Sequence, residues 1–210
     1  MPDNFPQIAA RLVETAAAFY AHGWVLGTSG NLSAVVARDP LRLAITPSGA
    51  DKGALQANQI ILIDDQGRAL DDPSAKPSDE CPLHILLAKL RNAGAVLHTH
   101  SIWSTMLSNI YFDDCGLAIE GYEMLKGLAG VKSHEHREWL PIFENSQDMP
   151  ALAGSVADKL AQYPAAHGFM LRRHGLYTWG KDLSEAKRHV EILEFLLETV
   201  ARTRLASGSH

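Results

Sequence analysis

The chain has 210 residues, 46% of them hydrophobic, and a formal net charge of -5. This length and apolar content predict one sizeable core and a single domain over residues 1–210. The acidic balance, without any basic run, argues against a nucleic-acid partner, and no apolar run approaches the roughly 20 residues that a membrane span needs. Because the two cysteines, Cys81 and Cys115, make no disulfide framework, we expect a reducing, cytoplasmic location.

The spacing of apolar residues predicts an α/β domain with a central sheet and helices around it. Strands are expected at residues 41–45, 60–63, 95–97, 169–172 and 176–179. Helices are expected at residues 5–20, 83–90, 101–110 and 148–163, followed by a long last helix. We expect Ser78 and Ser184 to cap the helices that follow them, because a serine hydroxyl can accept a hydrogen bond from an early backbone N–H.

Two of the predicted strands run into histidines. His98 and His100 follow the apolar run 95–97, and residues i and i+2 of an extended segment project from the same face. His174 follows the strand predicted at 169–172. An isolated His-x-His pair is more often two ordinary histidines, but three histidines at strand ends, with a fourth position open, are typical of a catalytic zinc site.

Two charged stretches between these histidines are harder to interpret. Residues 118–127 carry two carboxylates and a lysine in an otherwise apolar setting, where an ionised group is costly unless it has a partner or a function. Residues 133–137 contain another His-x-His sequence, but it is charged on both sides and no apolar strand leads into it. We interpret this second stretch as a solvated loop rather than as a pair of metal ligands.

Three polar turns of similar composition precede the strand of His98, at residues 27–33, 46–49 and 76–80. Glycines there let backbone N–H groups converge, and hydroxyl groups flank them, so that each turn could hold a phosphate. Taken alone, each is equally an ordinary polar turn. A phosphorylated ligand would explain all three together.

The three histidines and the nearby carboxylates suggest a zinc-dependent reaction. A zinc ion held by three neutral histidines can polarise a carbonyl or stabilise the enediolate left when a neighbouring proton is removed. Such a reaction needs a general acid or base, and burial raises the pKa of a carboxyl group into a useful range. Glu80 and Glu123 are the two candidates. Hydrolysis by a zinc hydroxide is the competing use of the same ligands, and the phosphate turns argue mildly against it.

Five motifs in this order resemble those of the class II aldolase/adducin superfamily and span most of the chain: Gly27-Thr28-Ser29-Gly30-Asn31-Leu32-Ser33, Thr46-Pro47-Ser48-Gly49, Pro77-Ser78-Asp79-Glu80, His98-Thr99-His100-Ser101 and Arg172-Arg173-His174-Gly175. Each motif alone is weak, whereas five in order are specific. Within that superfamily, residues 123–127 and 172–180 are similar to the methylthioribulose-1-phosphate dehydratase family.

The resemblance implies a three-layer α/β/α sandwich with a central, mostly antiparallel sheet, and a homotetramer with active sites near subunit contacts. It implies one Zn²⁺ per subunit, bound by His98, His100 and His174, and Glu123 as the catalytic acid/base. It also implies the residues that bind the sugar phosphate, namely Ser29, Gly30, Asn31, Ser48, Gly49, Ser78 and Lys126. The implied reaction is dehydration of 5-methylthioribulose 1-phosphate to 5-methylthio-2,3-dioxopentyl phosphate in methionine salvage.

Two departures from the pattern leave alternatives open. Sugar-phosphate aldolases of the superfamily commonly show two serines where this chain has Ser78 and Asp79, so either Asp79 points away from the phosphate or the phosphate lies elsewhere. Glu80 stands where those aldolases carry their catalytic glutamate, which leaves the division of roles between Glu80 and Glu123 open. The alternative functions are an aldolase or epimerase acting on another ketose phosphate, of the fuculose 1-phosphate or ribulose 5-phosphate type, and a non-catalytic binding module like the adducin head.

Overall fold

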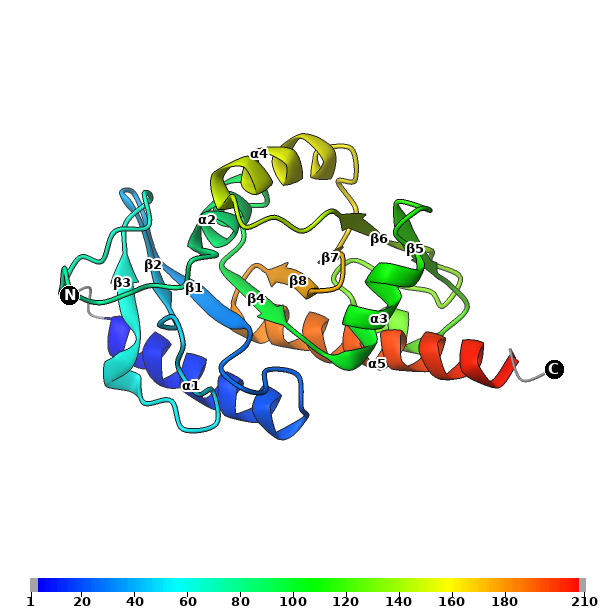
Figure 1. The fold of residues 1–210 in the computed structure, drawn as a ribbon, viewed down its shortest axis with the longest axis horizontal. Helices are drawn as coiled ribbons and strands as arrows, with labels where there is room; N and C mark the ends of the chain where they lie inside the picture. Colours follow the sequence, from blue (N-terminus) through cyan, green and yellow to red (C-terminus); the bar gives the residue numbers. More distant parts are fainter. Residues whose placement is uncertain (1–3, 208–210) are drawn as a thin grey trace.

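An eight-stranded sheet in the order β3-β2-β1-β4-β8-β7-β6-β5 runs through the computed structural model (Figure 1). All neighbouring strands are antiparallel except β6 and β7, which are parallel. The structure describes residues 4–207, so residues 1–3 and 208–210, at the two ends of the predicted domain, lie outside the described residues. The strands are β1 (Asn31–Arg38), β2 (Leu41–Ile45), β3 (Ile61–Ile63), β4 (Ala95–Thr99), β5 (Gly116–Ile119), β6 (Glu138–Phe143), β7 (Gly168–Leu171) and β8 (Gly175–Gly180).

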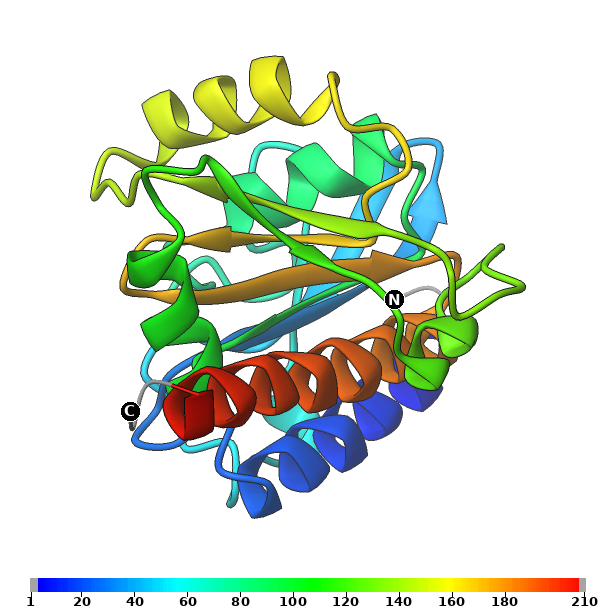
Figure 2. The same cartoon turned by 90° about the vertical axis from the view of Figure 1, so that its right-hand side faces the viewer.

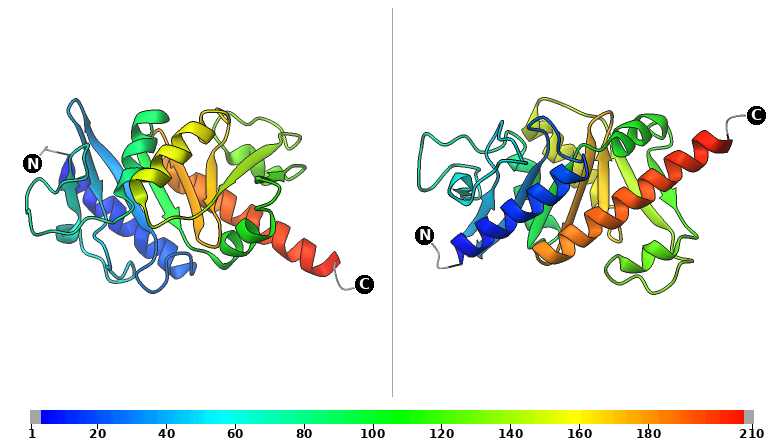
Figure 3. Two further views of the ribbon diagram at one scale, coloured as in Figure 1. Left: turned by 45° about the horizontal axis from the view of Figure 1, so that its top comes forward. Right: turned by 90° about the horizontal axis from the view of Figure 1, so that it is seen from below.

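Helices cover both faces of this sheet, as Figure 2 shows most clearly. α2 and α4 lie on one face, and α1 and α5 lie side by side on the other, where Figure 3 shows them from below. The helices are α1 (Phe5–Ala21), α2 (Cys81–Leu90), α3 (Ile102–Ile110), α4 (Met149–Leu160) and α5 (Leu183–Ser207), with short 3₁₀ helices η1 (Ala57–Gln59) and η2 (Glu123–Gly127). This confirms the predicted α/β/α sandwich with a mostly antiparallel sheet. Among residues 4–207, no helix combines the length and apolarity needed to cross a membrane.

The central strand β4 supplies side chains to the cores on both faces. Leu97 packs in one core with residues of α1 and α5, and Val96 packs in the other with residues of α2 and α4. Successive residues of a strand point to opposite faces, so an all-apolar run is what a strand buried on both faces requires. The same alternation continues into the histidines and directs His98 and Thr99 to opposite faces of the sheet.

Most predicted elements are present, but both predicted serine caps are wrong. α2 begins at Cys81 with Glu80 at its N-cap, so Ser78 precedes the helix; its hydroxyl accepts hydrogen bonds from the Asn31 amide and from the backbone N–H of Glu80. α5 begins at Leu183, and its first turn is capped by the carboxylate of Asp182, which accepts a hydrogen bond from the backbone N–H of Glu185. Asp182 directly precedes the helix, and its carboxylate also interacts favourably with the positive end of the helix dipole.

The packing of β4 predicts a large difference between two leucine truncations. Leu97 is fully buried, whereas Leu26 is 54% exposed. We expect Leu97→Ala to lower the free energy of unfolding by about 2–5 kcal/mol, because it removes buried methyl groups and leaves a cavity. We expect Leu26→Ala to change it by less than about 0.5 kcal/mol. Urea unfolding of both variants measures the difference, and equal losses would contradict this account of the core.

Candidate active site

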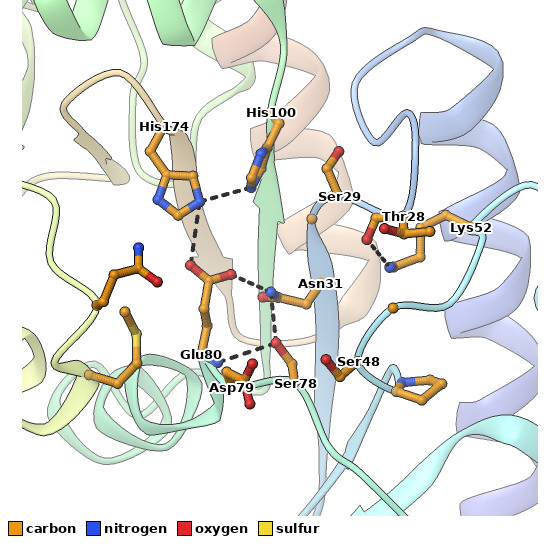
Figure 4. A pocket seen from close by; sticks show the side chains of 15 residues that line it. Thr28, Ser29, Asn31, Ser48, Lys52, Ser78, Asp79, Glu80, His100 and His174 are labelled. Atoms are coloured by element: carbon orange, nitrogen blue, oxygen red, sulfur yellow. Dashed lines mark hydrogen bonds and ion pairs between the residues drawn. The ribbon is translucent and has the colours of Figure 1, made fainter.

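Three histidines converge where β4 and the β7–β8 turn meet. His98 is the fourth residue of β4, His100 follows the strand, and His174 lies in the turn. The Nε2 atoms are 2.7 Å apart for His98 and His100, 3.0 Å for His100 and His174, and 3.3 Å for His98 and His174. Figure 4 shows two of these side chains, from separate segments, pointing at a common place. The structure therefore brings the three predicted metal ligands together.

The Nδ1 hydrogen bonds of His98 and His174 leave the Nε2 lone pairs of these two rings free. His98 Nδ1 lies 3.0 Å from the carbonyl oxygen of Leu176, which can only accept, so Nδ1 carries the proton. His174 Nδ1 likewise faces the side-chain oxygen of Asn145 at 3.3 Å. Burial is the main cause that lowers the pKa of all three imidazoles, to about 2 for His100 and well below the usual value for His98. Neutral rings with facing lone pairs cannot satisfy one another, but they can share a cation.

A carboxylate completes this cluster. Glu80 Oε2 lies 3.5 Å from the Nε2 atom of His98, and Glu80 Oε1 lies 3.5 Å from that of His174. Glu80 Oε1 is buried and has no hydrogen-bond donor within the described residues. The ligand atoms of Glu80, His98, His100 and His174 all lie within 4.8 Å of one another, so the cluster could hold a metal ion. Three neutral imidazoles and one carboxylate form a donor set that fits zinc.

Asn31 fixes the position of Glu80. It begins β1 and pairs directly with His98 of β4. Its amide N–H groups donate to Glu80 Oε2 and to the hydroxyl of Ser78, while its Oδ1 accepts from Nε2 of the fully buried His84. Gly30, just before it, has φ +69°, and a Cβ atom there would lie 2.7 Å from the carbonyl oxygen of His98. Only glycine therefore allows β1 to approach β4 this closely.

A polar cavity of about 400 Å³ opens beside the cluster, and the three polar turns lie along its wall (Figure 4). Six of the predicted substrate-binding residues line it, namely Ser29, Gly30, Asn31, Ser48, Gly49 and Ser78. Asp79 also lines this cavity. Gln147, from the loop after β6, and Met149, the first residue of α4, form part of the lining and were not predicted.

Lys52 is a lining residue that the sequence analysis missed. Its side chain is almost completely buried, and its ammonium group donates to the carbonyl oxygens of Thr28 (3.1 Å) and Ala50 (2.9 Å). Burial is the main cause that lowers its pKa. The available signal was a lysine three residues after the turn at 46–49. Because Lys52 brings a positive charge to two of the polar turns, that end of the cavity suits a phosphate better than the end occupied by Asp79.

Glu123 and Lys126 lie outside this cavity. Both belong to η2, where the Lys126 ammonium donates to Glu123 Oε1 at 2.6 Å, and the Glu123 side chain is 72% exposed. The segment after η2 is held through His189, which accepts from the backbone N–H of Ala129 and donates to the carbonyl oxygen of Trp179. η2 therefore lies near the Gly180 end of β8 (Figure 2). The six residues after His174, which form β8, span roughly 20 Å of extended chain.

A buried carboxyl group lies behind the histidines on the opposite face of the sheet. Glu194 of α5 is 1% exposed, and its Oε1 accepts a hydrogen bond from the hydroxyl of Thr99, the residue between His98 and His100. Burial is the main cause that raises its pKa to about 7. The signal for it in the sequence is an acidic residue placed inside the apolar stripe of the last helix.

Comparison with known proteins identifies the family of this chain. Residues 10–201 match the family described as Class II Aldolase and Adducin N-terminal domain. The chain belongs to this family. Relatives from Marinobacter nauticus (40% identical) and Methylococcus capsulatus (42%) are named methylthioribulose-1-phosphate dehydratase, and each comparison covers 95% of both chains. The crystal structure of L-fuculose-1-phosphate aldolase from Thermus thermophilus shares the fold, with a TM-score of 0.77 at 22% identity over 98% of this chain and 100% of that one.

The buried Glu194 predicts a pH dependence of stability. Its pKa in the folded chain, about 7, exceeds that of an exposed glutamate, so folding favours the protonated form and its contribution is lost as the pH rises through 7. Glutamine keeps the uncharged form at every pH. We expect Glu194→Gln to gain stability relative to the parent chain between pH 5 and pH 8, on the order of 2–3 kcal/mol.

Urea unfolding at the two pH values measures this gain. Glu198→Gln, four residues along the same helix and partly exposed, is the matched control and should show no such gain. A Glu194→Gln variant whose difference from the parent chain is the same at both pH values would contradict the prediction.

Proposed function

We propose that this chain is a hydro-lyase that dehydrates 5-methylthioribulose 1-phosphate to 5-methylthio-2,3-dioxopentyl phosphate, a step of methionine salvage. The observation that carries this proposal is the 40–42% identity, over 95% of the chain, to relatives named methylthioribulose-1-phosphate dehydratase. The neutral histidine cluster beside a phosphate-suited cavity provides independent support. An aldolase acting on another ketose phosphate uses the same kind of site, and the comparison with the aldolase structure at 22% identity extends only to the fold.

His98, His100 and His174 would hold one zinc ion per chain, with Glu80 beside it. Zinc bound there would supply a Lewis acid that polarises the substrate carbonyl and makes the proton on the next carbon easier to remove. Three nitrogen donors and one nearby carboxylate leave room for substrate oxygen atoms. The facing, unprotonated Nε2 atoms are the structural support for this assignment.

The substrate phosphate would bind at the Lys52 end of the cavity. The hydroxyls of Ser29 and Ser48 and the backbone at Gly49 face the same space, and the Lys52 ammonium has three N–H donors, of which the two carbonyl contacts use two. A phosphate there places the rest of the ketose toward the histidines at the other end of the cavity. This arrangement orients the substrate with its reacting carbons next to Glu80.

Dehydration requires removal of the C3 proton and departure of the C4 hydroxyl. The electron pair of the C3–H bond forms the C3–C4 double bond as the C4–O bond breaks, the hydroxyl leaves as water, and the enol becomes the diketone by tautomerisation. Glu80 is the cavity carboxylate that lies beside the histidines and can accept the C3 proton, and its hydrogen bond with Asn31 fixes its position. Hydrogen-bond reach to the reacting group is the first requirement of a general base.

Glu123 can take part only from a neighbouring chain. It is exposed and lies at the far end of β8 in its own chain, so a second copy that places η2 against the cavity would bring a second carboxylate to the substrate. We therefore propose a homotetramer whose subunit contacts combine Glu80 of one chain with Glu123 of the next, where Glu123 protonates the leaving hydroxyl. The cytoplasmic location stays a prediction, and both Cys81 and Cys115 are free thiols.

Removal of the metal should abolish the reaction. We expect zinc-loaded protein to convert 5-methylthioribulose 1-phosphate to the diketone, chelator-treated protein to have no activity, and added Zn²⁺ to restore it. His174→Ala should contain less than one metal ion per chain, because it loses one of three nitrogen donors. Diketone formation and metal content are measured on the same samples. Full turnover by metal-free protein, or no turnover by zinc-loaded protein, would contradict the proposal.

The roles of the two carboxylates predict the result of mixing two inactive variants. We expect Glu80→Gln and Glu123→Gln each to lower kcat by about 10²-fold or more, because each removes a proton-transfer group. When the two proteins are dissociated and reassembled together, some sites combine the intact carboxylate of each, so part of the activity should return. Normal activity of Glu123→Gln would exclude Glu123, and inactive mixed oligomers would exclude its supply by a neighbouring chain.

A further inference from the structure

A second histidine–carboxylate cluster lies at the other end of the sheet. Glu138 begins β6, His136 lies two residues before it, and His167 directly precedes β7. None of these residues belongs to the active-site cluster, and His136 and His167 line a separate cavity near the Gly180 end of β8. We infer that His136, Glu138 and His167 form a second binding site for a divalent metal ion of the zinc type.

The distances between the potential ligand atoms fit such an ion. Glu138 Oε2 is 2.9 Å from Nε2 of His136 and 2.9 Å from Nδ1 of His167, and all three atoms lie within 4.8 Å of one another. Ligand atoms that each lie about 2.0–2.2 Å from a shared zinc ion are separated by roughly 3 Å or slightly more. The three side chains therefore need only small adjustments to surround an ion.

Two further hydrogen bonds hold the ligands in place before any ion binds. The backbone N–H of His167 donates to Glu138 Oε1 at 2.9 Å, and Nε2 of His167 donates to the carbonyl oxygen of Ala129 at 2.8 Å. A metal-binding histidine usually donates its other ring N–H to a carbonyl or carboxylate in this way. His189, whose ring lies 5.2 Å from that of His167, uses both nitrogens on backbone groups and is a support rather than a ligand.

The cluster holds a proton on His167 that a metal ion would replace. His167 donates from both ring nitrogens, to Glu138 and to Ala129, so its ring is the charged imidazolium. Its hydrogen bond to Glu138 raises the pKa of His167 despite its burial, and the same pair lowers that of Glu138. When a metal ion binds, the Nδ1–H bond of His167 breaks, the proton passes to solvent, and the freed lone pair coordinates the ion. The net gain is one positive charge beside a carboxylate that is 1% exposed.

The surroundings leave one side of the site open. The adjoining cavity has a volume of about 550 Å³, and the side chain of His136, 28% exposed, lies at its edge. Three protein ligands and an accessible fourth position are the usual arrangement of a zinc site that keeps a water molecule or binds a small ligand. Glu185 lines the same cavity and offsets the charge of Lys181, with which it forms an ion pair.

The test is metal binding by a chain whose first site has been removed. His100→Ala/His174→Ala protein is dialysed against Zn²⁺, and its metal content is measured, with circular dichroism and thermal unfolding as checks of folding. We expect about one equivalent per chain. Adding His136→Ala should abolish binding, whereas adding His134→Ala, an exposed histidine of the same loop, should leave it unchanged.

The parent chain gives an independent measurement if the double variant does not fold. It should bind two equivalents of Zn²⁺, and the His136→Ala variant should bind one, with a matching loss of one Co²⁺ absorption component when cobalt replaces zinc. No binding by folded His100→Ala/His174→Ala protein would overturn the inference. Binding that persists after His136→Ala would also overturn it, because the second ion would then lie elsewhere.

Discussion

The register of β4 between β1 and β8 is the constraint on which the active site depends. It places His98 opposite Asn31 on one side and Tyr177 on the other, and the Tyr177 ring stacks on the His98 imidazole with ring centroids 3.9 Å apart. Two glycines allow this close approach, because a Cβ at Gly30 or Gly175 would lie 2.7 Å or 2.0 Å from a β4 carbonyl oxygen. A shift of one residue would turn His98 to the other face of the sheet, so that it would no longer lie beside His100 and His174.

Because successive residues of β4 point to opposite faces of the sheet, the segment 98–100 lies next to different buried polar groups on each face. On the α2 face, the buried His84 orients Asn31, which in turn holds Glu80 next to the histidines. On the α5 face, the carboxyl group of Glu194 receives the hydroxyl of Thr99. Burying polar groups costs less free energy when they have such partners, and these hydrogen bonds also limit how the side chains can move. The sheet therefore positions the cluster: His98 lies in β4, His100 directly follows β4, and His174 lies in the tight turn between β7 and β8.

The sequence predicted the site best where the relevant residues lie close together in the chain. The spacing of His98 and His100 on a predicted strand, together with the composition of the polar turns, was sufficient to predict one site. Contacts between distant segments were not predictable in this way. Lys52 and Glu194 look like ordinary charged residues until the fold buries them. β1, β5 and β6 were also missed, because β1 begins inside a polar turn and the other two lack a clear apolar alternation. The position of Glu123 depends on how η2 is anchored near β8, which its own motif does not reveal.

The central claim is that the three histidines hold a zinc ion against a sugar-phosphate substrate in this cavity. The most direct measurement is a crystal structure of the Glu80→Gln variant soaked with Zn²⁺ and 5-methylthioribulose 1-phosphate, with data collected at the zinc absorption edge. The account predicts an anomalous peak between the Nε2 atoms of His98, His100 and His174, with the substrate phosphate at the Lys52 end of the cavity. No zinc signal between these histidines, or a phosphate bound outside the cavity, would contradict it.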